Sequence, residues 1–136
     1  MPDHAVTRSV VVPAPAGETW DALVDPERLE DWFADTVEAE NLEPDAEVSF
    51  SWDDGERREA VIEEVDAPNR LSFRWSDIEG EVSRVAFLLD EHEGGTQVTV
   101  IESGLTDRAV ARRAAGNQAW GPRMASLSGA LAAVTV

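Results

Sequence analysis

The chain has 136 residues, of which 28 are acidic and 11 basic, so its formal net charge is −17. This length fits one domain, and no apolar run approaches the roughly 18 residues needed to cross a bilayer. Cysteine is absent, which excludes disulfides, thiolate nucleophiles and thiolate-bound metals. Every basic residue is arginine, so a Schiff-base lysine and a P-loop lysine are also excluded.

The acidic charge limits the classes of partner. A field of this sign repels phosphate backbones and anionic lipid surfaces. We therefore expect no nucleic-acid partner and no membrane partner. The first residues lack the order of a secretion signal, so we also expect a cytoplasmic protein.

The carboxylate excess and the missing lysine have two explanations, adaptation to high salt and GC-rich codon usage. Adaptation to high salt predicts that stability rises from low to molar NaCl, because screening quenches the repulsion between carboxylates. Thermal unfolding followed by circular dichroism across a salt series measures this. A flat response would reject the high-salt explanation.

A strand and two short helices are expected at the start of the chain. The β-branched run at residues 6–12 predicts the strand. Pro15 can open a helix whose apolar face includes Trp20. Asp25 can cap a second helix that has Pro26 in its first turn.

Between residues 37 and 103 the apolar period changes to two, which predicts an antiparallel meander. Four hairpin signals punctuate it: Asp53-Asp54-Gly55, Ala67-Pro68-Asn69, Ile78-Glu79-Gly80 and Glu93-Gly94-Gly95. The apolar residues of one face are Val48, Phe50, Trp52, Leu71, Phe73, Trp75, Val85, Phe87, Leu89, Val98 and Val100. The opposite face is mostly polar, so another element must cover the apolar one.

The last third of the chain supplies that cover. Apolar residues recur there at helical spacing, at Trp120, Met124, Leu127, Leu131 and Val134. Pro122 lies inside this pattern and predicts a bend or restart of the helix near Ala119. The expected class is α+β, with one long C-terminal helix laid across the sheet.

Three segments resemble a known family: residues 19–27 (TWDALVDPE), residues 68–75 (PNRLSFRW) and residues 95–105 (GTQVTVIESGL), followed by Ala119-Trp120. They are similar to the START-like (SRPBCC) superfamily, and within it to homologues of the activator of heat shock protein 90 ATPase. The resemblance implies one helix-grip domain over residues 1–136, with residues 1–5 frayed. In that fold a curved antiparallel sheet wraps the C-terminal helix and encloses a pocket for an apolar or amphipathic ligand.

Glu102 is the polar residue that stands out. The alternation from Val98 and Val100 places it on the inward face, close to where the last helix begins. A carboxylate there must find a donor or raise its pKa. It either pairs with an arginine or backbone amides, or orients a ligand hydroxyl or amine.

The remaining candidates are mainly large apolar side chains, which form either a solid core or the walls of the pocket. The full set of predicted ligand-binding residues is Trp32, Phe50, Trp52, Phe73, Trp75, Phe87, Glu102, Asn117, Trp120 and Met124. His4, His92, Asp53-Asp54 and Glu63-Glu64 are expected at the surface; of the last pair, only one can face inward. We expect no catalytic residue, no metal and no cofactor.

Three functions fit these patterns. The favoured one is binding of a small apolar or aromatic ligand between the sheet and the C-terminal helix. A cyclase-like or aromatase-like enzyme could use the same pocket, although a chain without tyrosine, cysteine or inward histidine offers few acid–base groups. A cochaperone-like interaction protein is the third. A homodimer is compatible with each.

Overall fold

The computed structural model describes residues 4–77, 80–106, 109–110 and 120–134. In chain order its elements are β1 (His4–Val12), α1 (Ala16–Val24), α2 (Pro26–Trp32), β2 (Thr36–Glu38), β3 (Glu47–Ser51), β4 (Arg57–Asp66), β5 (Arg70–Ser76), β6 (Val82–His92), β7 (Gly95–Leu105) and α4 (Trp120–Val134). The predicted bend near Ala119 lies outside the described residues, as does Asn117. Pro122 lies within the described part of α4.

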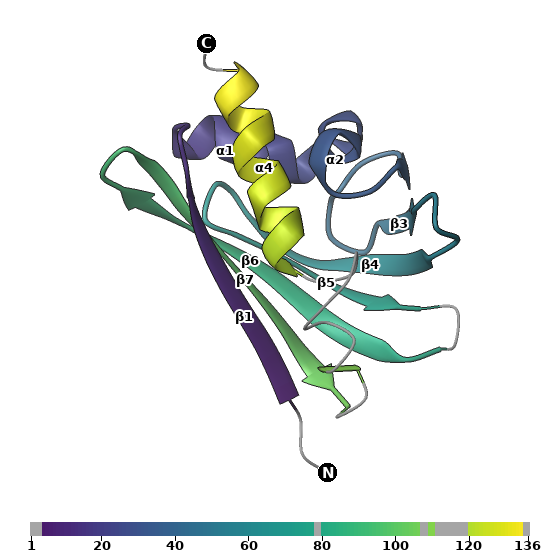
Figure 1. Cartoon of the computed structure of the whole chain (residues 1–136). Coiled ribbons are helices and arrows are strands. Elements are labelled where there is room, and N and C mark those ends of the chain that lie inside the picture. The colour runs from purple at the N-terminus through teal and green to yellow at the C-terminus, as the bar shows by residue number, and fades with distance from the viewer. Residues whose placement is uncertain (1–3, 78–79, 107–108, 111–119, 135–136) are drawn as a thin grey trace.

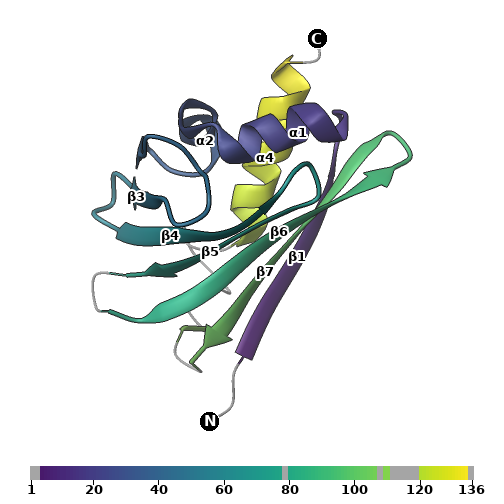
Figure 2. The same ribbon diagram turned by 180° about the vertical axis from the view of Figure 1, so that it is seen from behind.

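The described strands form one antiparallel sheet of seven, in the order β1-β7-β6-β5-β4-β3-β2. The sheet curves, and α4 lies across its concave side (Figure 1). Helices α1 and α2 lie beside α4 at one end of the sheet, as the view from behind also shows (Figure 2). This arrangement confirms the predicted helix-grip fold.

The first elements follow the sequence signals with small shifts. Strand β1 starts at His4, which pairs with Leu105, so His4 and Ala5 belong to the strand instead of a frayed start. Pro15 is the N-cap of α1, not its first helical residue. The Asp25 side chain caps α2 as predicted, accepting the Glu27 backbone N–H at 3.0 Å.

The predicted inward face of the meander is confirmed: its residues are buried except Trp52, which is half-buried. Strand β4 adds Arg58, Ala60 and Ile62 to this face, which periodicity did not predict. Glu63 and Glu64 are both exposed, because the β4–β5 register shifts between Ile62 and Glu64. The expectation that these two carboxylates lie at the surface is therefore confirmed.

The outer face of the sheet carries ion pairs on its β4–β6 part. Arg57 contacts Glu59 at 2.9 Å, Arg70 contacts Glu64 at 2.6 Å, and Arg84 contacts Glu63 at 3.1 Å. The hydroxyl of Ser49 and the guanidinium of Arg57 donate to Glu59 and lower the pKa of its carboxyl group.

No helix in the described part of the chain is long and apolar enough to cross a membrane.

Candidate ligand-binding site

Glu102 lies at the centre of a buried hydrogen-bond cluster between the sheet and α4. Its side chain is 0% exposed. One carboxylate oxygen, Oε2, accepts from Ser83 Oγ at 2.6 Å and from Trp75 Nε1 at 3.1 Å. The other, Oε1, accepts from Trp120 Nε1 at 2.9 Å. The carboxylate therefore ties the first residue of α4 to strands β5, β6 and β7.

These contacts confirm the predicted burial of Glu102 and its need for donors. Among the described residues, two indole N–H groups and one hydroxyl donate to it. The residues just before α4, where an arginine or backbone amides were predicted as partners, lie outside the described part of the chain. Trp75 Nε1 also lies 3.0 Å from Ser83 Oγ, so this indole is shared between two acceptors. A buried carboxylate with several such partners is held in one orientation.

A layer of stacked rings lies beside this cluster. Phe33, Trp75 and Trp120 have ring centroids 5.8–6.0 Å apart and interplanar angles of 19–23°. Phe50 meets Phe33 edge to face at 4.9 Å, and Phe87 meets Trp120 in the same way at 5.8 Å. These separations are those of direct ring contact.

The structure thus brings most of the predicted site residues together as packed side chains. Seven of them are no more than 8% exposed: Trp32, Phe50, Phe73, Trp75, Phe87, Trp120 and Met124. They fill the space between the sheet and α4 that the family resemblance assigns to a ligand pocket. Trp52 differs from them because its ring is only half-buried.

Two arginines, missed by the sequence analysis, lie among these rings. The guanidinium carbon of Arg123 is 4.8 Å from the ring centroid of Trp52 and 5.1 Å from those of Phe33 and Trp120. Arg58 lies 4.5 Å over Trp75 and contacts Glu56 at 3.2 Å. Both side chains are at most 5% exposed, a setting in which cation–π attraction is strongest.

Sequence spacing places each arginine on the same face as buried residues. Arg123 follows Trp120 by three residues and so shares its helical face, and Arg58 alternates with Ala60 and Ile62.

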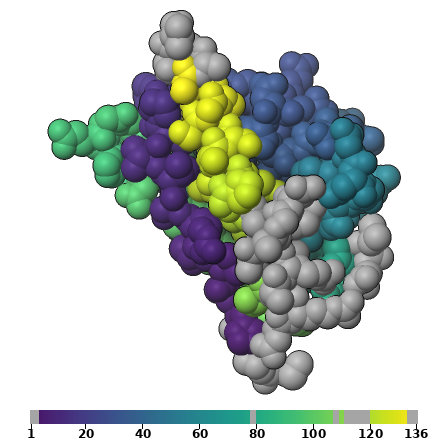
Figure 3. Space-filling model, in the orientation of Figure 1, coloured from purple at the N-terminus to yellow at the C-terminus, as the bar shows by residue number. Residues whose placement is uncertain are grey.

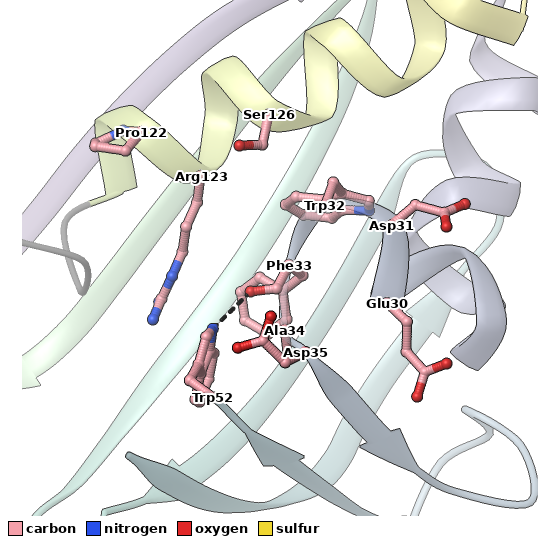
Figure 4. Close-up of a pocket in the computed structure, with 10 residues that line it drawn as sticks. All are labelled: Glu30, Asp31, Trp32, Phe33, Ala34, Asp35, Trp52, Pro122, Arg123 and Ser126. Atoms are coloured by element: carbon pink, nitrogen blue, oxygen red, sulfur yellow. Dashed lines mark hydrogen bonds between the residues drawn. The ribbon is translucent and has the colours of Figure 1, made fainter. Parts of the chain in front are cut away.

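A pocket of about 260 Å³ opens where α2, the end of β3 and the first turn of α4 meet (Figure 4). Its lining residues are Glu30, Asp31, Trp32, Phe33, Ala34, Asp35, Trp52, Pro122, Arg123 and Ser126. Arg123 extends from α4 toward Trp52, whose Nε1 donates to the Phe33 carbonyl at 2.9 Å. Of the predicted site residues, Trp32 and Trp52 line this pocket.

Carboxylates form part of the rim. Glu30 accepts the Val37 backbone N–H at 2.9 Å, and Asp35 accepts the Asp53 backbone N–H at 2.6 Å. These bonds fix α2 and the segment after β3 around the opening. The pocket combines aromatic walls, a guanidinium on one side and an acidic rim, which suits a flat ligand without negative charge.

Among the described residues, no group of three or more histidines and carboxylates is placed to hold a metal ion. His92 lies exposed at the β6–β7 hairpin, where its Nδ1 contacts the Glu93 carbonyl at 2.8 Å.

Several solved structures share this fold. DynU16, a protein of the dynemicin biosynthetic locus, is 31% identical with a TM-score of 0.84. The match covers 96% of this chain and 48% of DynU16, so this chain spans about half the length of that protein. MLL2253 from Mesorhizobium loti is 19% identical with a TM-score of 0.87, over 98% of this chain and 100% of that one. CalU16 from Micromonospora echinospora is also 19% identical, with a TM-score of 0.75 over 98% and 78% of the two chains.

The last two likenesses concern the fold alone. No curated protein matches the sequence. The family model described as "Activator of Hsp90 ATPase homolog 1-like protein" matches residues 13–132. The chain therefore belongs to the activator of Hsp90 ATPase homologue 1-like family, within the START-like (SRPBCC) superfamily.

Proposed function

We propose that the protein binds a small apolar or aromatic molecule in the pocket beside Trp52, where α2, the end of β3 and α4 meet. The half-buried ring of Trp52 carries the proposal. It contacts Phe33 at 5.8 Å and Phe50 at 6.4 Å, so it belongs to the ring cluster, yet part of it lines an open pocket. An aromatic surface left open in a concavity is the usual mark of a ligand site.

The polar groups of the pocket narrow the chemistry of this ligand. The Arg123 guanidinium and the Ser126 hydroxyl can donate to an oxygen of the ligand. The carboxylates of Glu30, Asp31 and Asp35 disfavour an anion. A volume of about 260 Å³ falls just below the usual range of about 300–1,000 Å³ for ligand pockets. The proposed ligand is therefore a small, flat, uncharged molecule with an oxygen acceptor.

Two matched probes test this chemistry. We expect 2-naphthol to bind and 2-naphthoate to bind at least about tenfold more weakly, a difference of about 1.4 kcal/mol, because the rim repels the carboxylate. Isothermal titration calorimetry measures both affinities. Equal affinities would contradict the proposed role of the rim, and no binding of either probe would contradict an aromatic site. Native mass spectrometry of freshly purified protein would show any co-purified compound.

Variants at position 52 locate the site. Trp52→Ala should weaken 2-naphthol binding about tenfold or more, since it removes one aromatic wall. Trp52→Phe is the matched control, which keeps a ring but loses the hydrogen bond to Phe33. The control should retain most of the affinity. Unchanged binding by Trp52→Ala would place the ligand elsewhere.

Native mass spectrometry of the purified protein would also reveal catalysis. Conversion of a co-purified compound during incubation would favour the cyclase-like alternative over simple binding. Binding without turnover supports the proposal.

A further inference from the structure

Strand β1 is a long sheet edge whose ladder with β7 is regular from Val6 to Val12, with a register shift between His4 and Val6. The sheet order places β1 at one end and β2 at the other. Strand β2 has three residues, whereas β1 has nine and pairs with β7 alone among the described strands. Natural edges of this length are normally blunted by proline, by several charges or by a covering element. Within β1 there is no proline, and its ionisable residues are His4 and Arg8.

The distribution of carboxylates singles out the same part of the molecule. Strands β1 and β7 and helix α4 together contain one carboxylate, Glu102, in a chain that has 28. Glu102 is 0% exposed, so the solvent-facing surface of these three elements carries no acidic side chain. In a protein with net charge −17, such a surface is the place where a second acidic molecule meets the least repulsion.

These elements adjoin at one edge of the sheet, with α4 on the concave side of β1 and the outward residues of β1 on the opposite side. Helix α4 packs along β1, and the two lie side by side in the space-filling view (Figure 3). The exposed residues of α4 are small or compact: Gly121, Pro122, Ala125, Ser126 and Gly129. On the outer side of the sheet, Thr7, Ser9 and Val11 are exposed, and Val11 is 41% exposed. We name β1 together with the exposed side of α4 the β1–α4 face.

We propose that the β1–α4 face is the interface of a homodimer, in which the two β1 edges pair antiparallel across a two-fold axis. A second copy is the occupant because it presents the same surface without carboxylates and an edge strand of the same length. The outward N–H and C=O groups of its β1 complement those of the first copy.

The position of the axis follows from Arg8. An axis at Arg8 would set two guanidinium groups directly opposite each other, which destabilises a strand pair. An axis at Ser9 sets Arg8 opposite Val10 and Thr7 opposite Val11. The proposed axis therefore passes at Ser9.

Sedimentation equilibrium of the full chain over a concentration series tests the dimer, and one matched pair of variants locates it. Val11→Glu adds a carboxylate on the β1–α4 face, while Val82→Glu makes the same change at a valine that is 52% exposed on β6. We expect Val11→Glu to weaken dimerisation about tenfold or more, because each new carboxylate would replace a valine opposite Thr7 of the second copy and would lose water in the strand pair. Val82→Glu should dimerise like the original chain.

The absence of cysteine permits a direct test of the axis. Ser9→Cys should form a disulfide-linked dimer under mild oxidation, because residues facing each other across antiparallel strands lie about 4.5–5.5 Å apart at Cα, within disulfide reach. Ser72→Cys, on β5 in the middle of the sheet, is the control and should stay unlinked.

Three results would overturn the proposal. They are a monomeric original chain throughout the concentration series, equal dimerisation of Val11→Glu and Val82→Glu, and equal cross-linking of Ser9→Cys and Ser72→Cys. The dimer does not depend on ligand binding, so it can fail or succeed independently of the proposed pocket.

Discussion

Replacing Trp120 with alanine is expected to lower the free energy of unfolding by about 3–5 kcal/mol, the usual cost of removing a large buried aromatic side chain. The ring is 1% exposed and contacts Phe33, Trp75 and Phe87. Its indole also donates to Glu102 at 2.9 Å. The substitution therefore removes packing and a buried hydrogen bond at the point where α4 meets the sheet.

Urea unfolding followed by far-ultraviolet circular dichroism measures this loss. Trp120→Phe separates the two contributions, since it keeps an aromatic ring and removes the indole donor. We expect an intermediate loss of about 1–3 kcal/mol for this variant, because Glu102 then loses one of its donors. A loss below about 1 kcal/mol for Trp120→Ala, the average effect of a point mutation, would show that α4 does not depend on this ring.

Glu102→Ala is the second substitution with a large expected effect. It leaves the indoles of Trp75 and Trp120 and the hydroxyl of Ser83 without their acceptor in a buried setting. Each unsatisfied buried donor costs about 1–3 kcal/mol, so the expected loss of unfolding free energy is about 3 kcal/mol or more. The same urea titration gives the value.

Glu102→Gln is the matched control, because it removes the charge and keeps the shape of the side chain. Its amide keeps one oxygen acceptor but turns an NH₂ group toward a donor, so we expect a smaller loss than for alanine. A double-mutant cycle with Ser83→Ala then isolates the coupling between the carboxylate and the hydroxyl. A Glu102→Ala variant within about 0.5 kcal/mol of the original, as at an ordinary surface position, would contradict the role of the cluster in stability.

The inward position of Glu102 was predicted correctly, because that prediction depended only on the two-residue alternation of a strand. Two-residue periodicity from Val98 to Glu102 fixed its face, and the β7 ladder kept that register. The Asp25 cap was predicted for a similar reason, since the cap and the proline after it act locally. Predictions that depend only on neighbouring residues hold in the folded structure almost unchanged.

The parts that periodicity missed depend on contacts between distant segments. Phe33 fits the helical repeat of Leu29 and Trp32 and is the C-cap of α2, but that repeat did not predict its contacts with rings from β3, β5 and α4. Arg58 and Arg123 are buried because aromatic faces surround them, and only the assembled ring cluster provides those faces. The exposure of Trp52 is likewise set by how closely α2 and the first described turns of α4 approach its ring.

The stacked indoles of Trp75 and Trp120 also give the molecule an internal optical marker. Their centroids lie 6.0 Å apart with planes inclined by 23°, and one ring belongs to the sheet while the other opens the last helix. Electronic transitions at such a separation couple, and the coupling vanishes once the two segments part. Helix docking can therefore be followed by circular dichroism in the indole absorption bands, without any attached dye and separately from the total helical content.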